Sequence, residues 1–272
     1  MAKYQFGFIG CGNMGGALVR AIAPEVGGDN VLIADRLTAN VDALRNACGV
    51  QVAKNALEVV RDAKYIFLGV KPQGMRDLLT ELSPILKTKE ERFVLISMAA
   101  GITVAAIQEM VDIHDAAVVR ILPNTPAAVG KGMTLYCLSA SVLNEEERDI
   151  ATALEAAGKV DLLEESFIDA GCAVSGCGPA FVYLFMEAMA DGAVAAGLPR
   201  QKAILYAAQT VLGAAEMLIQ SGKHPGELKD AVCSPGGSTI QGVNALEQGA
   251  FRATVMQAVL DAYHKTQSLG KS

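Results

Sequence analysis

The chain has 272 residues, of which 51% are hydrophobic and 19% are charged, and its formal net charge is −6. This length allows two domains with full cores, and the apolar content excludes a disordered chain. The sequence contains no basic run of the kind that binds nucleic acid. The six cysteines form no C-x-x-C pair, which fits a reduced cytosol, so we expect a cytoplasmic protein.

Metal sites and membrane segments are not predicted. The three histidines are scattered along the chain, which gives no metal-ligand spacing. No basic segment precedes the first apolar run, so no signal peptide is expected. The two most apolar windows, 116–138 and 179–198, are each interrupted by charged residues, and we expect neither to span a membrane.

The chain begins with the pattern of a dinucleotide-binding unit. Tyr4–Ile9 is predicted to be a strand, and it is followed by the glycine-rich run Gly10–Gly15 and an apolar-faced helix that should end before Pro24. Val31–Ala34 is predicted to be the second strand, and it closes on Asp35. A G-x-G-x-x-G between a strand and a helix, with an acid 20 residues past its last glycine, is the fingerprint of such a unit.

Strand and helix signals alternate up to about residue 162. The strands expected after the first two are 51–52, 65–70, 93–98, 118–122 and 134–138, and the helices are 38–48, 56–61, 78–86, 103–110 and 145–157. Repeated strand–helix units predict a mainly parallel, doubly wound sheet.

Beyond residue 162 the signals are helical throughout, over 179–196, 200–220, 225–232, 239–248 and 251–269. Pro179–Ala196 is apolar nearly all round, interrupted by Glu187 and Asp191, and is too apolar for the surface of a small monomeric bundle. Either other helices of the chain or a second subunit must enclose it, and we favour the subunit. The expected fold is an N-terminal α/β Rossmann-type dinucleotide-binding domain (1–162) plus an all-α C-terminal domain (163–272).

One turn in the helical half has the character of an anion site. Ser234–Gly237 (Ser-Pro-Gly-Gly) predicts a tight turn leading into a helix, and Ser238 with Gln241 has the S-x-x-Q spacing of a capping box. A helix start preceded by glycines leaves backbone N–H groups free to bind a carboxylate or phosphate. The Thr239 hydroxyl could reach a ligand beyond the anion. An ordinary helix–helix connection is the alternative.

Taken together, the chain resembles the pyrroline-5-carboxylate reductases over essentially its whole length. The most specific likeness is the run Ser-Pro-Gly-Gly-Ser-Thr at 234–239; the others are Phe8–Gly15, Val70–Pro72, Ala99–Gly101, Asn124–Pro126 and Ser175–Ala180. The resemblance implies NAD(P)H-dependent reduction of the cyclic imine Δ1-pyrroline-5-carboxylate to proline, the last step of proline biosynthesis. It also implies dimers of intertwined helical domains, often assembled into rings.

The resemblance also implies which residues form the site. The cofactor is implied to lie on Gly10, Cys11, Gly12, Asn13, Met14 and Gly15, with Asn55, Val70, Lys71, Pro72, Ala99 and Ala100 alongside the ribose and nicotinamide. The substrate carboxylate is implied to bind at Ser234, Gly237, Ser238 and Thr239, mainly through backbone amides, and the Thr239 hydroxyl to meet the imine nitrogen as the catalytic contact. Glu165 could contact the iminium side of the substrate or complement the dipole at a helix start.

The second strand gives opposing indications about the cofactor. Asp35 could accept hydrogen bonds from the adenosine ribose hydroxyls, which favours NADH, whereas Arg36 could pair with a 2′-phosphate. We expect NADPH as the principal cofactor, with NADH also used.

Three alternative functions stay open. In β-hydroxyacid dehydrogenases a lysine ends the pattern G-x-G-x-x-x-K as acid/base, and Val182 stands at that position here. A nucleotide-sensing binding protein would keep the first domain, but the intact 234–239 run argues against it. A related reductase of a six-membered cyclic imine is not distinguished, because one ring methylene discriminates by only about 1–3 kcal/mol.

Overall fold

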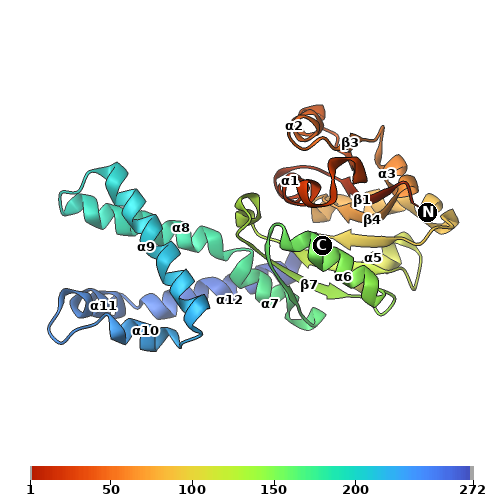
Figure 1. Cartoon of the computed structure of the whole chain (residues 1–272). Coiled ribbons are helices and arrows are strands. Elements are labelled where there is room, and N and C mark those ends of the chain that lie inside the picture. Colours follow the sequence, from red (N-terminus) through yellow and green to blue (C-terminus); the bar gives the residue numbers. More distant parts are fainter. Residues whose placement is uncertain (1, 270–272) are drawn as a thin grey trace. The chain divides into compact units, whose positions relative to one another are not determined.

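The computed structural model describes residues 2–269. The chain forms two compact units (Figure 1). Within the described residues, the first unit consists of 2–177 and 262–269, and the second is Gly178–Asp261.

The first unit is built on one eight-stranded sheet with the order β3-β2-β1-β4-β5-β6-β7-β8. Its strands are β1 (Tyr4–Ile9), β2 (Val31–Ala34), β3 (Gln51–Val52), β4 (Ala63–Leu68), β5 (Val94–Ser97), β6 (Val118–Leu122), β7 (Gly132–Leu138) and β8 (Gly158–Leu162). All neighbouring strands pair in parallel except β6 and β7, which are antiparallel. The order turns at β1, as in doubly wound sheets, whose ligands bind outside the carboxyl ends of the strands.

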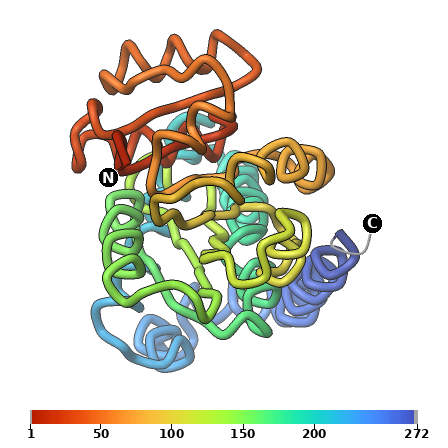
Figure 2. Tube along the Cα trace, turned by 90° about the vertical axis from the view of Figure 1, so that its right-hand side faces the viewer, coloured from red at the N-terminus to blue at the C-terminus, as the bar shows by residue number. Residues whose placement is uncertain are grey.

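Helices cover both faces of this sheet. They are α1 (Asn13–Val26), α2 (Thr38–Cys48), α3 (Ala56–Asp62), α4 (Met75–Thr88), α5 (Val104–Val111), α6 (Asn144–Glu155) and α7 (Glu165–Ser175), with short 3-10 helices at Gly28–Asn30, Pro72–Gly74 and Thr125–Val129. One core joins the sheet to α1, α2 and α6, and the other joins it to α3, α4, α5 and α7. In Figure 2 the green α6 and the yellow α5 lie on opposite sides of the strands. The central strands are buried on both faces, which is why they are apolar runs without alternation.

The second unit consists of α8 (Gly178–Ala195), α9 (Arg200–Ser221), α10 (Pro225–Ala231), α11 (Ser238–Gln248) and most of α12 (Phe251–Leu269). Its described residues bury little of their own apolar surface. The small core between α8 and α9 consists of Ala190, Ala203 and Ala207. Large apolar side chains such as Leu184, Leu205 and Ile219 remain exposed. The described part of the chain therefore does not enclose α8.

The segments Glu165–Ala195 and Arg200–Ser221 are also long and apolar enough to cross a membrane, judged by length and composition alone. We expected no such segment from the sequence, because of the charged residues in the apolar windows. This criterion is weak, since any apolar helix that packs against another protein surface meets it as well.

The expected fold class is confirmed, with differences at particular elements. Helix α1 was predicted to end before Pro24, but it continues to Val26 and ends at Gly27, whose φ is +85°. A proline this close to a helix end removes only one late hydrogen bond. The strand β8 was not predicted, because its sequence Gly-Lys-Val-Asp-Leu has no apolar run.

The bounds of helix α7 were not predicted, although the helix-dipole interpretation of Glu165 placed a helix start there. The domain limit expected between residues 162 and 163 falls just before it. Its residues Ile168 and Cys172 are buried in the core on the α5 side of the sheet, so the compact units divide only after Cys177.

Candidate cofactor and substrate sites

The three glycines after β1 have three different physical roles. Gly10 has a φ of +90°, which turns the chain sharply out of the strand. A Cβ on Gly15 would lie 2.2 Å from the Gly10 carbonyl oxygen, so only glycine lets α1 pack this closely on the loop. A Cβ on Gly12 would meet nothing within 4 Å. This open position is where the backbone of a dinucleotide-binding loop approaches the pyrophosphate, so the loop fits a dinucleotide.

The N-terminus of α1 is available to an anion. Gly12 is its N-cap, and no side chain accepts a hydrogen bond from the first turn. Free N–H groups at the positive end of a helix bind phosphate. A cavity of about 270 Å³ adjoins this turn; its lining includes Cys11, Gly12 and Asn13 from the loop, Arg20 from α1 and Asn40 from α2.

The acidic residue at the end of β2 is tied to the glycine-rich loop. Asp35 accepts a hydrogen bond from the Cys11 N–H at 2.5 Å and another from the Leu37 N–H at 2.7 Å. A contact between Asp35 and the ribose stays a prediction, since each oxygen already accepts one main-chain N–H. Burial, together with the nearby charge of Asp35, raises the pKa of the Cys11 thiol to about 12. A raised pKa disfavours the thiolate form, so the Cys11 thiol is a poor nucleophile.

The other predicted cofactor residues follow further strand ends. Val70, Lys71 and Pro72 come after β4, and Ala99 and Ala100 come after β5. Because β1, β2, β4 and β5 are parallel, these residues and the glycine-rich loop all lie at the carboxyl ends of the strands.

Asn55, after β3, has a second task. Its Oδ1 accepts the Glu58 N–H at 3.0 Å and caps α3, which leaves its amide NH₂ as the group available to a ligand.

The Ser-Pro-Gly-Gly turn leads into α11 in the second unit. Gly236 has a φ of +70°, and the Gly237 N–H donates to the Ser234 carbonyl at 3.0 Å. A Cβ on Gly237 would lie 2.5 Å from Ser234 Oγ, so this position is restricted to glycine. Ser238 and Thr239 follow with exposed side chains that have no hydrogen bond to the rest of residues 2–269.

The predicted capping box at this helix is wrong. Gly237, not Ser238, is the N-cap, and it provides no side-chain acceptor. Ser238 is the first helical residue, so its hydroxyl is past the position from which a cap accepts. The first N–H groups of α11 consequently have no side-chain partner, which suits the binding of a carboxylate better than a capped helix would.

Glu165, predicted as a substrate contact, already has partners in the first unit. Its Oε1 accepts the Val104 N–H at 2.8 Å and lies 3.5 Å from Arg120 Nη1. Arg120 Nη2 lies 2.5 Å from Asp169 Oδ1. Glu165 is also the first residue of α7, as the helix-dipole interpretation required. A substrate role for it stays a prediction.

Arg120 and Asp169 were missed by the sequence reasoning. The available signal was an arginine inside the apolar strand Val118–Leu122, which is unusual unless it is paired.

Comparisons with known proteins identify the family of the chain. A family model described as pyrroline-5-carboxylate reductase dimerisation matches residues 165–269, and one described as NADP oxidoreductase, coenzyme F420-dependent, matches residues 5–101. The pyrroline-5-carboxylate reductase of Escherichia coli is 39% identical over 270 residues, covering 98% of this chain and 99% of that one. This chain belongs to the pyrroline-5-carboxylate reductase family.

Solved structures give the same result. A pyrroline-5-carboxylate reductase from Coxiella burnetii is 30% identical with a TM-score of 0.90, covering 99% of this chain and 100% of that one. The pyrroline carboxylate reductase of Plasmodium falciparum, solved with NADP bound, is 32% identical with a TM-score of 0.86, covering 99% of both chains. The chain is thus an oxidoreductase with an NADP-type Rossmann domain and a helical dimerisation domain.

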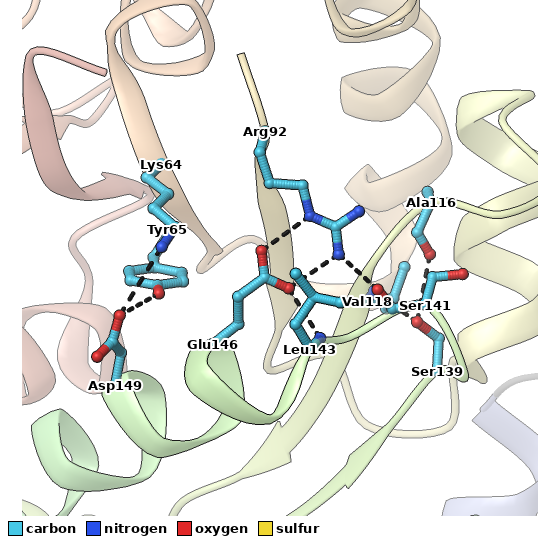
Figure 3. Close-up of polar contacts among 10 residues, drawn as sticks. All are labelled: Lys64, Tyr65, Arg92, Ala116, Val118, Ser139, Ser141, Leu143, Glu146 and Asp149. Carbon is cyan, nitrogen blue, oxygen red and sulfur yellow. Dashed lines mark hydrogen bonds and ion pairs between the residues drawn. The ribbon is translucent and has the colours of Figure 1, made fainter. Parts of the chain in front are cut away.

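In this reductase a different polar cluster lies at the amino ends of the parallel strands, as Figure 3 shows. Arg92 binds both carboxylate oxygens of Glu146 on α6, with Nε–Oε1 at 2.8 Å and Nη2–Oε2 at 2.9 Å. Glu146 is fully buried and also accepts the Leu143 N–H at 3.0 Å. Beside it, Tyr65 donates to Asp149. Because Tyr65 stands near the start of β4, this cluster holds α6 at the amino ends of the strands, opposite the ends that carry the cofactor loop.

Proposed function

We propose that this reductase converts Δ1-pyrroline-5-carboxylate to L-proline with NADPH, the last step of proline biosynthesis. The observation that carries the proposal is the uncapped start of α11 behind Ser-Pro-Gly-Gly, in a chain that also has the three-glycine loop of a dinucleotide site. The substrate has one carboxylate and one C=N bond. The start of α11 suits the carboxylate, and the glycine-rich loop suits the cofactor that reduces the C=N bond.

The turn before α11 is proposed to hold the substrate carboxylate. The N–H groups of Ser238 and Thr239 stand at the positive end of the α11 dipole, while the Gly237 N–H donates to the Ser234 carbonyl and closes the turn before them. Backbone donors in a rigid turn need no side-chain ordering when the ligand arrives, so this anchor is preorganised.

Thr239 is proposed to orient the imine nitrogen. Held by the residues of the glycine-rich loop, NADPH would supply a hydride to the carbon of the C=N bond and become NADP+; a substrate that enters as the iminium already carries the proton that the amine nitrogen keeps. Alignment and exclusion of water matter more for this step than a strong base. The exposed Thr239 hydroxyl, one residue into α11, has no partner among residues 2–269 and is free to contact the nitrogen.

NADPH is proposed as the principal cofactor, with NADH also accepted. Arg36 is exposed beside the end of β2 and is available to a 2′-phosphate. Asp35, in contrast, is engaged with the Cys11 and Leu37 N–H groups, which weakens its competition for the ribose.

The exposed apolar faces of α8 and α9 are proposed to pack against a second copy of the chain, giving at least a homodimer, with a ring of dimers as a larger form. The match of 165–269 to a dimerisation model supports a protein partner for these faces, and not a membrane. We propose accordingly that the protein is cytoplasmic.

The test is NADPH oxidation with purified protein, with and without Δ1-pyrroline-5-carboxylate, followed at 340 nm. We expect imine-dependent oxidation and proline as the product. The six-membered cyclic imine acid, assayed in parallel, should have a lower kcat/KM. A higher kcat/KM for the larger ring would replace the proposed substrate with the larger imine, and NADPH binding without turnover of either would favour a sensing protein.

A further inference from the structure

The loop predicted to lie beside the nicotinamide is a short turn between β5 and α5. The Ser97 hydroxyl oxygen accepts the Ala99 N–H at 3.3 Å. Gly101 has a φ of +78°, and the Ile102 N–H donates back to the Ala99 carbonyl at 3.5 Å. Helix α5 begins two residues later, at Val104. The first turn of α5 therefore follows this loop directly along the chain.

Two side chains bind the first turn of α5: Thr103 Oγ1 accepts the Ala106 N–H at 3.2 Å, and the carboxylate of Glu165 binds the turn as well. The Val104 N–H donates to Glu165 Oε1 at 2.8 Å, and Val104 is the first residue of the helix. Such an N–H has no partner within its own helix. The bond to Glu165 is charge-assisted and lies at the positive end of the helix dipole, so it is stronger than a bond between neutral groups.

A buried arginine holds that carboxylate in turn. Arg120 is 1% exposed, on β6, with Nη1 at 3.5 Å from Glu165 and Nη2 at 2.5 Å from Asp169. A buried guanidinium is costly unless carboxylates pair with it, so Arg120 keeps both acids at fixed positions. Its Nε has no hydrogen-bond partner within the described residues, which makes these two contacts its principal compensation.

We propose that Glu165 is a positioning residue for the cofactor. Held by Arg120, its carboxylate fixes the Val104 N–H and thereby sets the Ala99–Thr103 loop against the nicotinamide end of NADPH. This inference rests on the proposed function, because it takes Ala99 and Ala100 as part of the cofactor site. It assigns Glu165 to cofactor binding and not to the substrate.

The two ends of one hydrogen bond can be removed independently. Glu165→Ala deletes the acceptor, and Val104→Pro deletes the donor. Proline suits the first position of a helix, and the preceding Thr103 is extended, with φ −78° and ψ 163°, as a residue before proline prefers. Glu165→Gln keeps an oxygen acceptor without the charge. The adjacent, exposed Glu164 provides the matched control, Glu164→Gln.

The readouts are the Kd for NADPH, from fluorescence titration, and the KM for the imine at saturating NADPH. Glu165→Ala and Val104→Pro should each raise the Kd about tenfold, near the lower end for one hydrogen bond to a charged group. The double variant should bind little worse than either single one, because both remove the same contact. Glu165→Gln should have a smaller effect and Glu164→Gln none, and the imine KM should stay within roughly twofold.

An unchanged Kd for NADPH in Val104→Pro would overturn the proposal, because the contact has been removed. A rise confined to the imine KM in Glu165→Ala would also overturn it and make Glu165 a substrate ligand. If Glu165→Ala does not fold, the Kd values for NADPH of Val104→Pro and Glu165→Gln still test the proposal. Wild-type turnover is measured first, so a chain without imine reduction would reject the proposed function and not this inference.

Discussion

Asp35 at the end of β2 accepts a hydrogen bond from the main-chain N–H of Cys11, in the middle of the glycine-rich loop, at 2.5 Å. A carboxylate at this position commonly receives the ribose of the cofactor. Here it also joins two strand ends to each other, so changes at Asp35 affect both the shape of the loop and the choice of cofactor.

Asp35→Asn and Asp35→Ser should raise the ratio of kcat/KM for NADPH to that for NADH. Both remove the negative charge that repels a 2′-phosphate. Asp35→Asn keeps one oxygen acceptor for a main-chain N–H, so it should lose less affinity for both cofactors than Asp35→Ser. Steady-state kinetics with each cofactor measures the ratio. If kcat/KM falls equally for both cofactors, so that their ratio is unchanged, Asp35 serves only to hold the loop.

Gly12→Ala should separate cofactor binding from folding. A Cβ at this position meets nothing within 4 Å, so the free energy of unfolding should change by less than about 1 kcal/mol. The same methyl would stand where the pyrophosphate approaches, so the Kd for NADPH should rise at least about tenfold. Gly15→Ala is the contrasting variant, because its Cβ would lie 2.2 Å from the Gly10 carbonyl and should destabilise the chain itself. Tight NADPH binding by Gly12→Ala would place the cofactor elsewhere.

Thr239→Ala should lower kcat as well as raise the KM for the imine. A hydrogen bond to a charged group contributes about 1.5–3 kcal/mol, which corresponds to roughly 10- to 150-fold in rate. Thr239→Ser keeps the hydroxyl and should retain most of the activity. Wild-type kcat/KM in Thr239→Ala would show that the hydroxyl is not at the reaction.

Ser238→Ala tests the corrected helix start. Because Gly237 is the N-cap, loss of the Ser238 hydroxyl should change the free energy of unfolding by less than about 0.5 kcal/mol. A loss of about 1 kcal/mol in thermal or urea unfolding would restore Ser238 as the cap.

Stability should fall in acid partly through Glu146. Burial alone would raise the pKa of this carboxyl, but the hydrogen bonds from Arg92 and the Leu143 N–H, with the charge of Arg92, outweigh burial and hold its pKa below the usual 4.5. Between the two pKa values the unfolded chain binds more protons than the folded one. The stabilisation is therefore present above pH 4.5 and is lost as the pH falls through the folded value.

Glu146→Gln should remove about 1–3 kcal/mol of stability at pH 7 and flatten the acid dependence of urea unfolding. The exposed neighbour Glu145, changed to Gln, is the control and should leave the pH profile unchanged. A profile for Glu146→Gln that parallels the wild type would show that other groups cause the acid dependence.

The exposed apolar side chains of α8 and α9 should determine the oligomeric state. Leu184 on α8 is 68% exposed within one chain, so Leu184→Glu should convert the dimer to a monomer at micromolar concentration, as measured by light scattering. Val129, in the first unit, is also strongly exposed, and Val129→Glu should leave the assembly intact. A monomeric wild type would disprove the proposed role of these side chains.

The sequence predicted the parts of the fold that depend on local pattern. The glycine-rich loop, the alternation of strands and helices, and Phe251–Leu269 could be read from periodicity and turn residues alone. Local pattern could not predict strand β8 or the pairing of Arg120 with Glu165 and Asp169. Each depends on a partner that the fold brings from elsewhere in the chain. The start of α11 was displaced by one residue, since serine and glycine are both good N-caps and local sequence does not choose between them.

The small interior of the second unit also bears on how the protein matures. Its fully buried apolar residues, among those described, are Ala190, Ala203 and Ala207, far too little to offset the chain entropy lost on ordering five helices. Folding of this unit should therefore be completed only when two chains meet, which makes refolding second order in protein concentration. A newly synthesised chain would meanwhile expose α8 and α9 to chaperones and to aggregation, so the yield of reductase in a cell would depend on how fast its chains find each other.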